Sequence, residues 1–340
     1  MSDQLNKDYD VGALIGRGRF GAVFRCVSRI SGELFAVKSI DKALLTDPLD
    51  YDPSREAKLH RLAAAGNPLA VQIHADYEDD ESIHLVLDFC HGPNLFHHIA
   101  DKGAPISEPE AAMLMGDLME AIAACHRRGV VHRDVKPENA VFDGAGRIRI
   151  VDFGSAGWIG EGGGMRELVG TPFYMAPEVE RGEVYGEKVD VWSAGVVLFT
   201  MLGGLPPSYC ETSAEIFEAV RWGSLRFPSR VFSGVSSAAK DLLERMICKE
   251  VSRRFSAEQV LRHPWIKSRE VEAVLNADFF GVVGVDGDAG QRGLIAKLAE
   301  QAERYEEERK ESSKAVAKGK GVEKIGQNKG DVKEAQSLRG

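Results

Sequence analysis

The chain has 340 residues, 44% of them hydrophobic and 28% charged, and its formal net charge is −9 at pH 7. This size suits one large two-lobed domain or two smaller domains, and the apolar content is enough for a sizeable core. The acidic balance, with no Lys/Arg run interleaved with aromatic residues, argues against a nucleic-acid partner. No stretch reaches about 18 apolar residues, so we expect no membrane-spanning helix.

The five cysteines are scattered and lack the spacing of a disulfide framework or a metal site. This usage is typical of a reduced protein, in which such thiols act as small hydrophobic residues. The polar start of the chain has no signal-peptide pattern. We therefore expect a cytoplasmic protein, with the nucleus as the alternative.

Residues 9 to about 90 favour strands, which we expect at 11–15, 21–27, 34–40, 70–73 and 83–87. One helix is expected from Ser54 to Leu62, with Ser54 as its N-cap. From Leu95 onward the pattern is helical, and Ser107 with Glu110 forms a capping-box signature for a long helix that ends before Gly129. A strand-rich small lobe (9–88) followed by a helix-rich large lobe (92–266) is an α+β arrangement.

The composition changes after Ile266, which begins a C-terminal extension at residues 267–340. Within it, 279–293 is Gly-rich, 294–314 is a charged helix candidate, and 315–340 has the composition of a disordered tail. The helix candidate is a solvated helix or, alternatively, a docking helix or short coiled coil.

Three glycines, Gly16, Gly18 and Gly21, form a G-x-G-x-x-G pattern between two expected strands. Such glycines let a hairpin backbone approach the phosphates of ATP without interference from side chains. The same pattern marks a dinucleotide-binding fold, but there a helix follows, whereas Ala22 and Val23 begin a strand. A plain Gly-rich hairpin is the alternative.

Lys38, in the third expected strand, is a candidate cation for the α- and β-phosphates of ATP. A kinase needs a carboxylate to hold that cation, and Glu56 in the expected helix is the best partner. A buried Lys–Glu pair without a catalytic role is the alternative.

The strongest signal is the run from His132 to Asn139, followed by Asp152-Phe153-Gly154. Phosphoryl transfer needs in-line positioning and positive charge more than covalent help. Asp134 is suited to orient the substrate hydroxyl, Lys136 to neutralise the transferring group, and Asn139 with Asp152 to hold Mg²⁺.

The next run, Gly170 to Glu178, contains Thr171, which we expect to hydrogen-bond near Asp134 and Lys136. A threonine at this place is associated with Ser/Thr rather than Tyr specificity. Two structural contacts are also expected. Glu178 should pair with Arg254. Asp190 should brace the catalytic loop, which is the run from His132 to Asn139.

Together these residues resemble the eukaryotic protein kinase superfamily over residues 9–266. The details are similar to the calcium/calmodulin-dependent branch, particularly the plant calcium-dependent kinases. Several stretches also look like plant phosphoenolpyruvate carboxylase kinases: Ile15 to Gly21, Asp152 to Ala156 and Cys248 to Ile266. That resemblance implies a small, monomeric, calcium-independent enzyme that uses ATP and Mg²⁺. It also implies a seryl target near the N-terminus of phosphoenolpyruvate carboxylase, and control through the amount of kinase.

The resemblance further implies an ATP site, with Leu87 as gatekeeper and the backbone of Asp88 and Cys90 as the adenine contacts. The residues of this site would be Ile15, Gly16, Gly18, Gly21, Val23, Ala36, Lys38, Asp88, Cys90 and Val141.

Some residues depart from the family pattern. Asn94 stands where related basophilic kinases carry an acidic residue for the ribose and a substrate arginine, whereas Glu138 keeps the other acidic position. We therefore expect a preference for a basic residue upstream of the target serine, weaker than in those relatives. His60 stands where a hydrophobic residue of the kinase spine is expected. It either packs as a satisfied histidine or loosens the small lobe.

Two further features bear on regulation. The fragment Asp286 to Gly290 fails as an EF-hand, because Gln291 replaces the Gly at position six and Lys297 the Glu at position twelve. We therefore expect neither calcium nor calmodulin as a partner. Between Gly157 and Gly170 there is no Ser, Thr or Tyr, so a carboxylate, from Glu161 or Glu167, would stand in for phosphate opposite Arg133.

Three interpretations remain open on the sequence. The first is a kinase acting on phosphoenolpyruvate carboxylase. The second is a related kinase with another protein substrate. The third is a non-catalytic pseudokinase scaffold, which the intact Lys38, Asp134 and Asp152 oppose.

Overall fold

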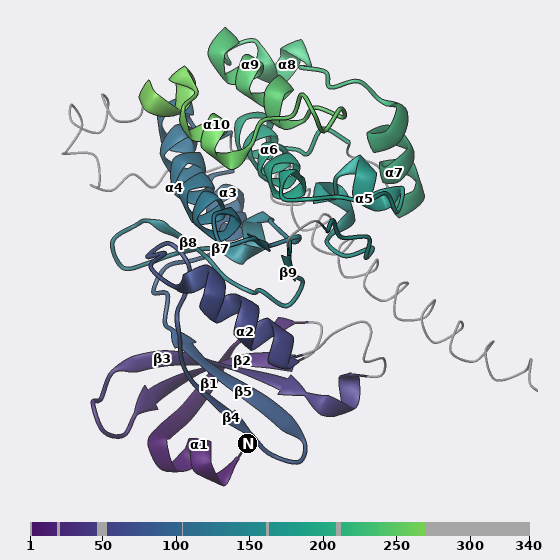
Figure 1. Ribbon diagram of the computed structural model, residues 1–340. Helices are drawn as coiled ribbons and strands as arrows, with labels where there is room; N and C mark the ends of the chain where they lie inside the picture. Colours follow the sequence, from purple (N-terminus) through teal and green to yellow (C-terminus); the bar gives the residue numbers. More distant parts are fainter. Residues whose placement is uncertain are drawn as a thin grey trace, which may run out of the picture.

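The computed structural model describes residues 2–18, 21–45, 53–103, 105–160, 163–208 and 212–268. Within these ranges the chain forms two lobes, with the five-stranded sheet at one end and the helices α3 to α10 at the other (Figure 1). Most of the extension, including the helix candidate at 294–314 and the fragment at 286–290, lies outside the described residues. So do Glu161 and Cys210.

The small lobe is built on one antiparallel sheet in the order β1-β2-β3-β5-β4. Its strands are β1 (Tyr9–Gly18), β2 (Gly21–Ser28), β3 (Leu34–Asp41), β4 (Ile73–Glu78) and β5 (Ser82–Asp88). The 3₁₀ turn η1 (Lys42–Leu44) follows β3, and α2 (Pro53–Ala64) crosses from the sheet towards the large lobe. The α+β architecture expected from the sequence is confirmed.

Two expectations for the small lobe are wrong. The apolar run 70–73 is not a strand: Ala70 makes a single bridge to Ile150, and β4 starts only at Ile73. Ala70 and Val71 are buried where the lobes meet, whereas β4 alternates exposed and half-buried positions. Ser54 is not an N-cap either, because α2 already begins at Pro53, a residue suited to the first helical turn.

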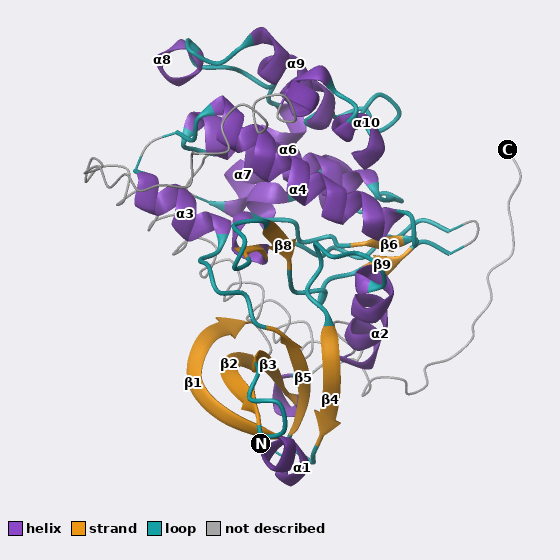
Figure 2. Cartoon of the chain, turned by 90° about the vertical axis from the view of Figure 1, so that its left-hand side faces the viewer, coloured by secondary structure: helices purple, strands orange, loops and turns teal. Residues whose placement is uncertain are grey.

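A helix missed by the sequence analysis, α1 (Asp3–Asp8), lies at the end of the sheet away from the large lobe (Figures 1 and 2). Ser2 caps it by accepting a hydrogen bond from the Leu5 amide at 3.1 Å. Leu5 is fully buried against Cys26, Val37 and Val86 of the sheet. The small lobe therefore has a second hydrophobic cluster on the sheet face covered by α1.

The large lobe is helical. Its helices are α3 (Leu95–Lys102), α4 (Glu108–His126), α5 (Pro177–Glu180), α6 (Lys188–Gly203), α7 (Ser213–Trp222), α8 (Ser229–Phe232), α9 (Ser237–Met246) and α10 (Ala257–Leu261). The helices α4 and α6 form its centre and are buried along most of their length. None of the described helices is long and apolar enough to cross a membrane.

Short strands and 3₁₀ turns between these helices carry the motifs identified in the sequence. The pairs are β6 (Val130–Val131) with β9 (Gly157–Trp158), and β7 (Ala140–Phe142) with β8 (Ile148–Ile150). The turns are η2 (Pro137–Asn139) and η3 (Pro172–Tyr174). The strands β6, β8 and β9 lie on the side of the large lobe that faces the small lobe (Figure 2).

The expected capping box of α4 is wrong. Ser107 occupies the N-cap position but its side chain makes no capping hydrogen bond. The Glu110 carboxylate instead binds His98 at 2.8 Å and Lys102 at 2.6 Å, both on α3. The tertiary contact between α3 and α4 has replaced the local one.

The expected pair of Glu178 and Arg254 is confirmed. Arg254 donates two hydrogen bonds to the Glu178 carboxylate, at 2.6 and 2.9 Å, and both side chains are buried. A bidentate pair of this kind fixes geometry as well as charge. It ties the start of α5 to the segment before α10.

The burial of Leu5 generates a test of whether α1 is part of the folded lobe. Leu5 is 0% exposed, so we expect Leu5→Ala to lower the free energy of unfolding by about 3 kcal/mol. Urea unfolding would measure this. Leu44→Ala is the matched control, because Leu44 is 49% exposed and should change stability by less than about 0.5 kcal/mol. Equal effects of the two variants would contradict the packing of α1.

Candidate active site

Lys38 lies between two carboxylates that come from different parts of the chain. Its ammonium is 2.7 Å from Glu56 Oε1 on α2 and 2.7 Å from Asp152 Oδ1 in the segment after β8. Burial opposes charge on the lysine, but the two carboxylates outweigh it and raise the pKa of Lys38 above its ordinary value. Lys38 is therefore a fixed cation, and the pairing with Glu56 expected from the sequence is confirmed.

The carboxylate of Asp134 is held by side chains from the same loop and from the Thr171 segment. Thr171 donates to Oδ1 at 2.7 Å, and at Oδ2 Lys136 lies at 2.9 Å and Asn139 Nδ2 at 3.2 Å. Lys136 also donates to the Thr171 hydroxyl at 2.9 Å. The expected contact of Thr171 with Asp134 and Lys136 is confirmed, and it fixes one rotamer of the aspartate.

The catalytic loop is braced from beneath by Asp190 of α6. This buried carboxylate accepts hydrogen bonds from the backbone amides of His132 at 2.8 Å and Arg133 at 2.7 Å, and it binds His126 Nε2 at 2.8 Å. Burial opposes its ionisation, but these donors hold the pKa of Asp190 below its ordinary value. The expected bracing role is confirmed.

Asn139 and Asp152 offer oxygen atoms suited to a hard divalent cation. Asn139 uses its amide nitrogen to donate to the Asp134 carbonyl at 2.9 Å, which turns its Oδ1 the other way. Asp152 binds Lys38 and the Gly154 amide through Oδ1, and its side chain is 45% exposed. A carboxylate and an amide oxygen, completed by phosphate oxygens and water, fit the preference of Mg²⁺.

The residues expected to bind ATP come from the small lobe, the junction of the lobes and β7 of the large lobe. Register pairs Gly16 with Val23, Gly18 with Gly21, and Val23 with Lys38. Gly21 is required by packing, because a Cβ there would collide with the carbonyl oxygen of Ser39. The other expected residues lie on β1 (Ile15), β3 (Ala36), the junction of the lobes (Asp88, Cys90) and β7 (Val141).

The side chain of Asp88 has a role that the sequence analysis missed. Its carboxylate accepts hydrogen bonds from the Gln72 amide at 3.0 Å and from Arg149 on β8, and it also binds His74. Burial opposes ionisation, but these partners hold the pKa of Asp88 below its ordinary value. The sequence pointed only to the Asp88 backbone, yet its carboxylate joins the two lobes.

The two residues expected to contact the substrate lie at the start of α3 and on η2. Asn94 caps α3, and its Oδ1 accepts from the backbone of His97 at 2.9 Å and contacts His97 Nδ1 at 2.7 Å. Glu138 Oε2 is buried without a hydrogen-bond partner among the described residues. Burial raises the pKa of Glu138. Asn94 is thus occupied, whereas Glu138 has an unused acceptor.

Arg133 anchors the segment between β9 and η3. It donates to the carbonyl of Ser155 at 2.6 Å, to Glu167 Oε2 at 3.1 Å and to the Tyr185 hydroxyl at 3.1 Å. Burial opposes ionisation of Glu167, but backbone donors and Arg133 hold its pKa below the ordinary value. Glu167 therefore stands as a charged carboxylate opposite Arg133.

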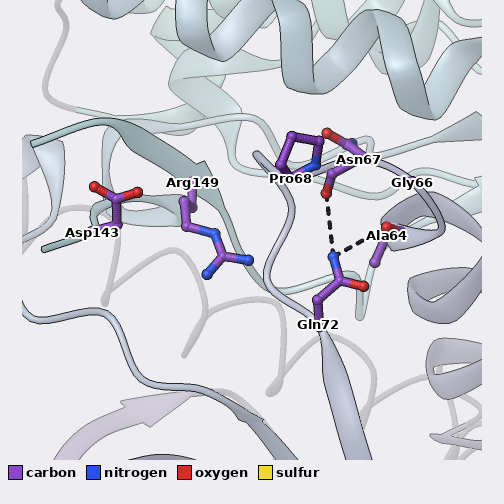
Figure 3. Close-up of a pocket in the computed structure, with 7 residues that line it drawn as sticks. All are labelled: Ala64, Gly66, Asn67, Pro68, Gln72, Asp143 and Arg149. Carbon is purple, nitrogen blue, oxygen red and sulfur yellow. Dashed lines mark hydrogen bonds between the residues drawn. The ribbon is translucent and has the colours of Figure 1, made fainter. Parts of the chain in front are cut away.

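A separate pocket of about 470 Å³ lies between the turn after α2 and the β7–β8 hairpin (Figure 3). Asp143 and Arg149 form one side, and Gln72 with the turn after α2 forms the other. Gln72 closes the turn by donating to the carbonyls of Ala64 and Asn67, at 3.1 and 3.2 Å. None of the expected ATP-site or substrate residues lines this pocket.

The sequence model of the protein kinase domain matches residues 9–266. Serine/threonine-protein kinase PEPKR2 of Arabidopsis thaliana is 43% identical over 264 residues, which cover 78% of this chain and 54% of that protein. Calcium-dependent protein kinase SK5 of Glycine max is 41% identical over 270 residues, which cover 78% of this chain and 52% of that protein.

The chain thus spans about half the length of the curated relatives it matches. The match of the kinase model covers most of the described residues, including every contact around Lys38, Asp134 and Asp190. The chain belongs to the protein kinase domain family, among the serine/threonine protein kinases related to the plant calcium-dependent enzymes.

Proposed function

We propose that this chain transfers the γ-phosphoryl group of ATP to a seryl hydroxyl of a protein substrate. The observation that carries the proposal is the Asp134 carboxylate, held in one orientation by Thr171, Lys136 and Asn139. An oriented carboxylate can accept a hydrogen bond from the attacking hydroxyl and align it with the phosphoryl group. The adjacent Lys136 supplies positive charge where negative charge develops.

The ATP phosphates would lie between the glycine-rich hairpin and Lys38, and the adenine would bond to the backbone of Asp88 and Cys90. Asn139 Oδ1 and the free oxygen of Asp152 would hold Mg²⁺, which neutralises charge on the phosphates. Lys38 orients the nucleotide because Glu56 and Asp152 leave its ammonium little freedom. A pseudokinase scaffold would not need this complete set of groups.

We propose phosphoenolpyruvate carboxylase as the protein substrate. The resemblance of the stretches Ile15 to Gly21 and Cys248 to Ile266 to kinases of that enzyme supports this choice. The fragment Asp286 to Gly290 departs from the EF-hand pattern at Gln291 and Lys297, and we propose that the activity is independent of calcium. The scattered cysteines support a cytoplasmic location, and we propose a monomer. The similarity to calcium-dependent kinases favours, as the second candidate, a related kinase with another substrate.

One assay tests the function. The protein is incubated with labelled ATP and Mg²⁺, with phosphoenolpyruvate carboxylase or a generic basic peptide, and with or without a calcium chelator. We expect label on a seryl residue of the carboxylase, no effect of the chelator, and no transfer by Asp134→Ala. Transfer to the peptide alone would favour the second candidate, and loss of activity with chelator would refute calcium independence. No transfer by well-folded protein to either acceptor would overturn the kinase proposal.

We propose that Glu167 replaces a phosphate group in the segment opposite Arg133, so that the enzyme is active without phosphorylation. Glu167→Gln keeps the size of the side chain but removes its charge. A charge-assisted hydrogen bond at a side chain that is 48% exposed contributes about 1 kcal/mol, so we expect kcat to fall about fivefold. Steady-state kinetics on unphosphorylated protein would measure this.

Glu244→Gln is the matched control for Glu167, because Glu244 is an exposed glutamate of α9, distant in sequence from the segment. It should leave kcat unchanged. Wild-type protein that gains activity only after treatment with an upstream kinase would contradict the role of Glu167.

The unused acceptor of Glu138 leads us to propose that it binds one basic side chain upstream of the target serine. We expect Glu138→Gln to lower kcat/KM about tenfold for a peptide with an upstream arginine, because the arginine loses a charged partner. A peptide with glutamine in its place should be little affected. Asn94→Asp, which keeps the cap and adds charge, should raise the preference for arginine. Equal losses on both peptides would argue against recognition by Glu138.

A further inference from the structure

His60 occupies a buried position on α2, one helical turn after Glu56. Its side chain is 1% exposed, although the ring is polar and a hydrophobic residue was expected there. Polar groups in such places are normally paired, because an unpaired buried group costs free energy. The contacts of His60 therefore indicate why the polar ring is present.

The ring makes two contacts with the groups around the site. Nε2 is 2.6 Å from the carbonyl oxygen of Val71. The ring also lies against Phe153, with centroids 4.5 Å apart, and Phe153 in turn contacts His132 at 5.0 Å. A continuous column of rings thus runs from α2 through the Asp152-Phe153-Gly154 segment to the catalytic loop.

The hydrogen bond to Val71 determines which ring nitrogen of His60 carries a hydrogen. A carbonyl oxygen can only accept, so Nε2 carries the hydrogen and donates it. Nδ1 is buried and has no partner in the described part of the chain. Burial lowers the pKa of His60 to about 4. Of the charged groups nearby, Lys38 on β3 and His132 of the catalytic loop also lower this pKa, whereas Asp152 after β8 raises it. The ring is therefore neutral at neutral pH, with the hydrogen on Nε2.

The acceptor of this bond is itself fixed to the large lobe. The Val71 amide donates to the Ile150 carbonyl at 3.1 Å, and the Ile150 amide donates to the Leu69 carbonyl at 2.7 Å. Ile150 is the last residue of β8, two residues before Asp152. His60 thus joins α2 to backbone that is hydrogen-bonded to β8 two residues before Asp152. An aliphatic side chain could pack on Phe153 but could not donate to Val71.

We propose that His60 is a positioning residue for phosphoryl transfer. As a neutral imidazole it donates Nε2–H to the Val71 carbonyl and packs on Phe153. These contacts hold α2 in the position in which the Glu56 carboxylate reaches the Lys38 ammonium. The role is additional to packing, because the hydrogen bond has a direction and a length that apolar contact lacks. His60 acts through Glu56 and does not itself touch ATP or the substrate.

The test compares three substitutions in the full chain. His60→Leu and His60→Phe remove the donor, the second while keeping a ring, and His60→Gln keeps a donor of similar reach. We expect the Leu and Phe variants to lose about tenfold in kcat/KM for ATP, mainly through KM, because an unpaired buried carbonyl disfavours the assembled site. His60→Gln should recover activity to within about threefold. Lys58→Gln, on the exposed face of α2, is the matched control and should be unchanged.

A double-mutant cycle separates positioning from general loosening of the lobe. If His60 acts through Glu56, His60→Leu should have little further effect on kcat/KM once Glu56 is replaced by Ala. Urea unfolding of each variant shows whether it is folded under assay conditions, and the Phe variant carries the test if the Leu variant is not. Wild-type activity of His60→Leu, failure of His60→Gln to recover activity, or additive losses in the cycle would each overturn the proposal.

Discussion

The structure depends on one lysine placed between two carboxylates. Lys38 lies on β3, the middle strand of the small-lobe sheet, Glu56 lies on α2, and Asp152 lies in the segment after β8. Both ion pairs measure 2.7 Å. The Lys38–Glu56 pair is buried, and removing either of its partners would leave an uncompensated charge, which is costly. The sheet, α2 and the segment after β8 must therefore keep fixed positions relative to one another. The arrangement that satisfies the fold is also the arrangement that presents a fixed cation to phosphates.

Next to this cation the backbone is strained. Arg133 and Asp152 have φ values of 67° and 61°, in the left-handed region that non-glycine residues seldom adopt. Each such residue costs on the order of 1–3 kcal/mol, so the surrounding structure must hold it. Asp190 does this at Arg133 by accepting the amide at 2.7 Å, and the Lys38 pair does it at Asp152. Among the described residues other than glycine, only these two adopt this conformation, and each lies in a loop that carries residues of the site.

The sequence predicted the centre of the site better than its surroundings. Lys38, Asp134 and Asp152 were predictable because phosphoryl transfer demands particular groups at particular spacings, and their contacts with Glu56 and Thr171 followed from that chemistry. The joint formed by the Asp88 carboxylate was missed, because its partners come from β8 and from the turn before β4. No local pattern announces a contact of this kind.

The errors in secondary structure have the same origin. The helix α1 has six residues, too few for a periodic pattern, and its stability comes from the burial of Leu5 against the sheet. Glu110 fitted the sequence pattern of a capping box, but its carboxylate binds His98 and Lys102 on α3 instead. The run at 70–73 fitted a strand pattern, but Ala70 and Val71 pair with the end of β8 in the large lobe instead. In each case tertiary packing outweighed a local preference.

The segment opposite Arg133 is held by several hydrogen bonds as well as by one ion pair. A phosphate group would bring a charge of about −1.5 to −2 and three acceptor oxygens, whereas Glu167 brings one charge and is half exposed. Arg133, however, also donates to the carbonyls of Ser155 and Ala156 and to the Tyr185 hydroxyl. These neutral acceptors are little affected by salt, and they satisfy a guanidinium that is almost buried. The segment is therefore held by directed hydrogen bonds to neutral acceptors together with the single charge of Glu167.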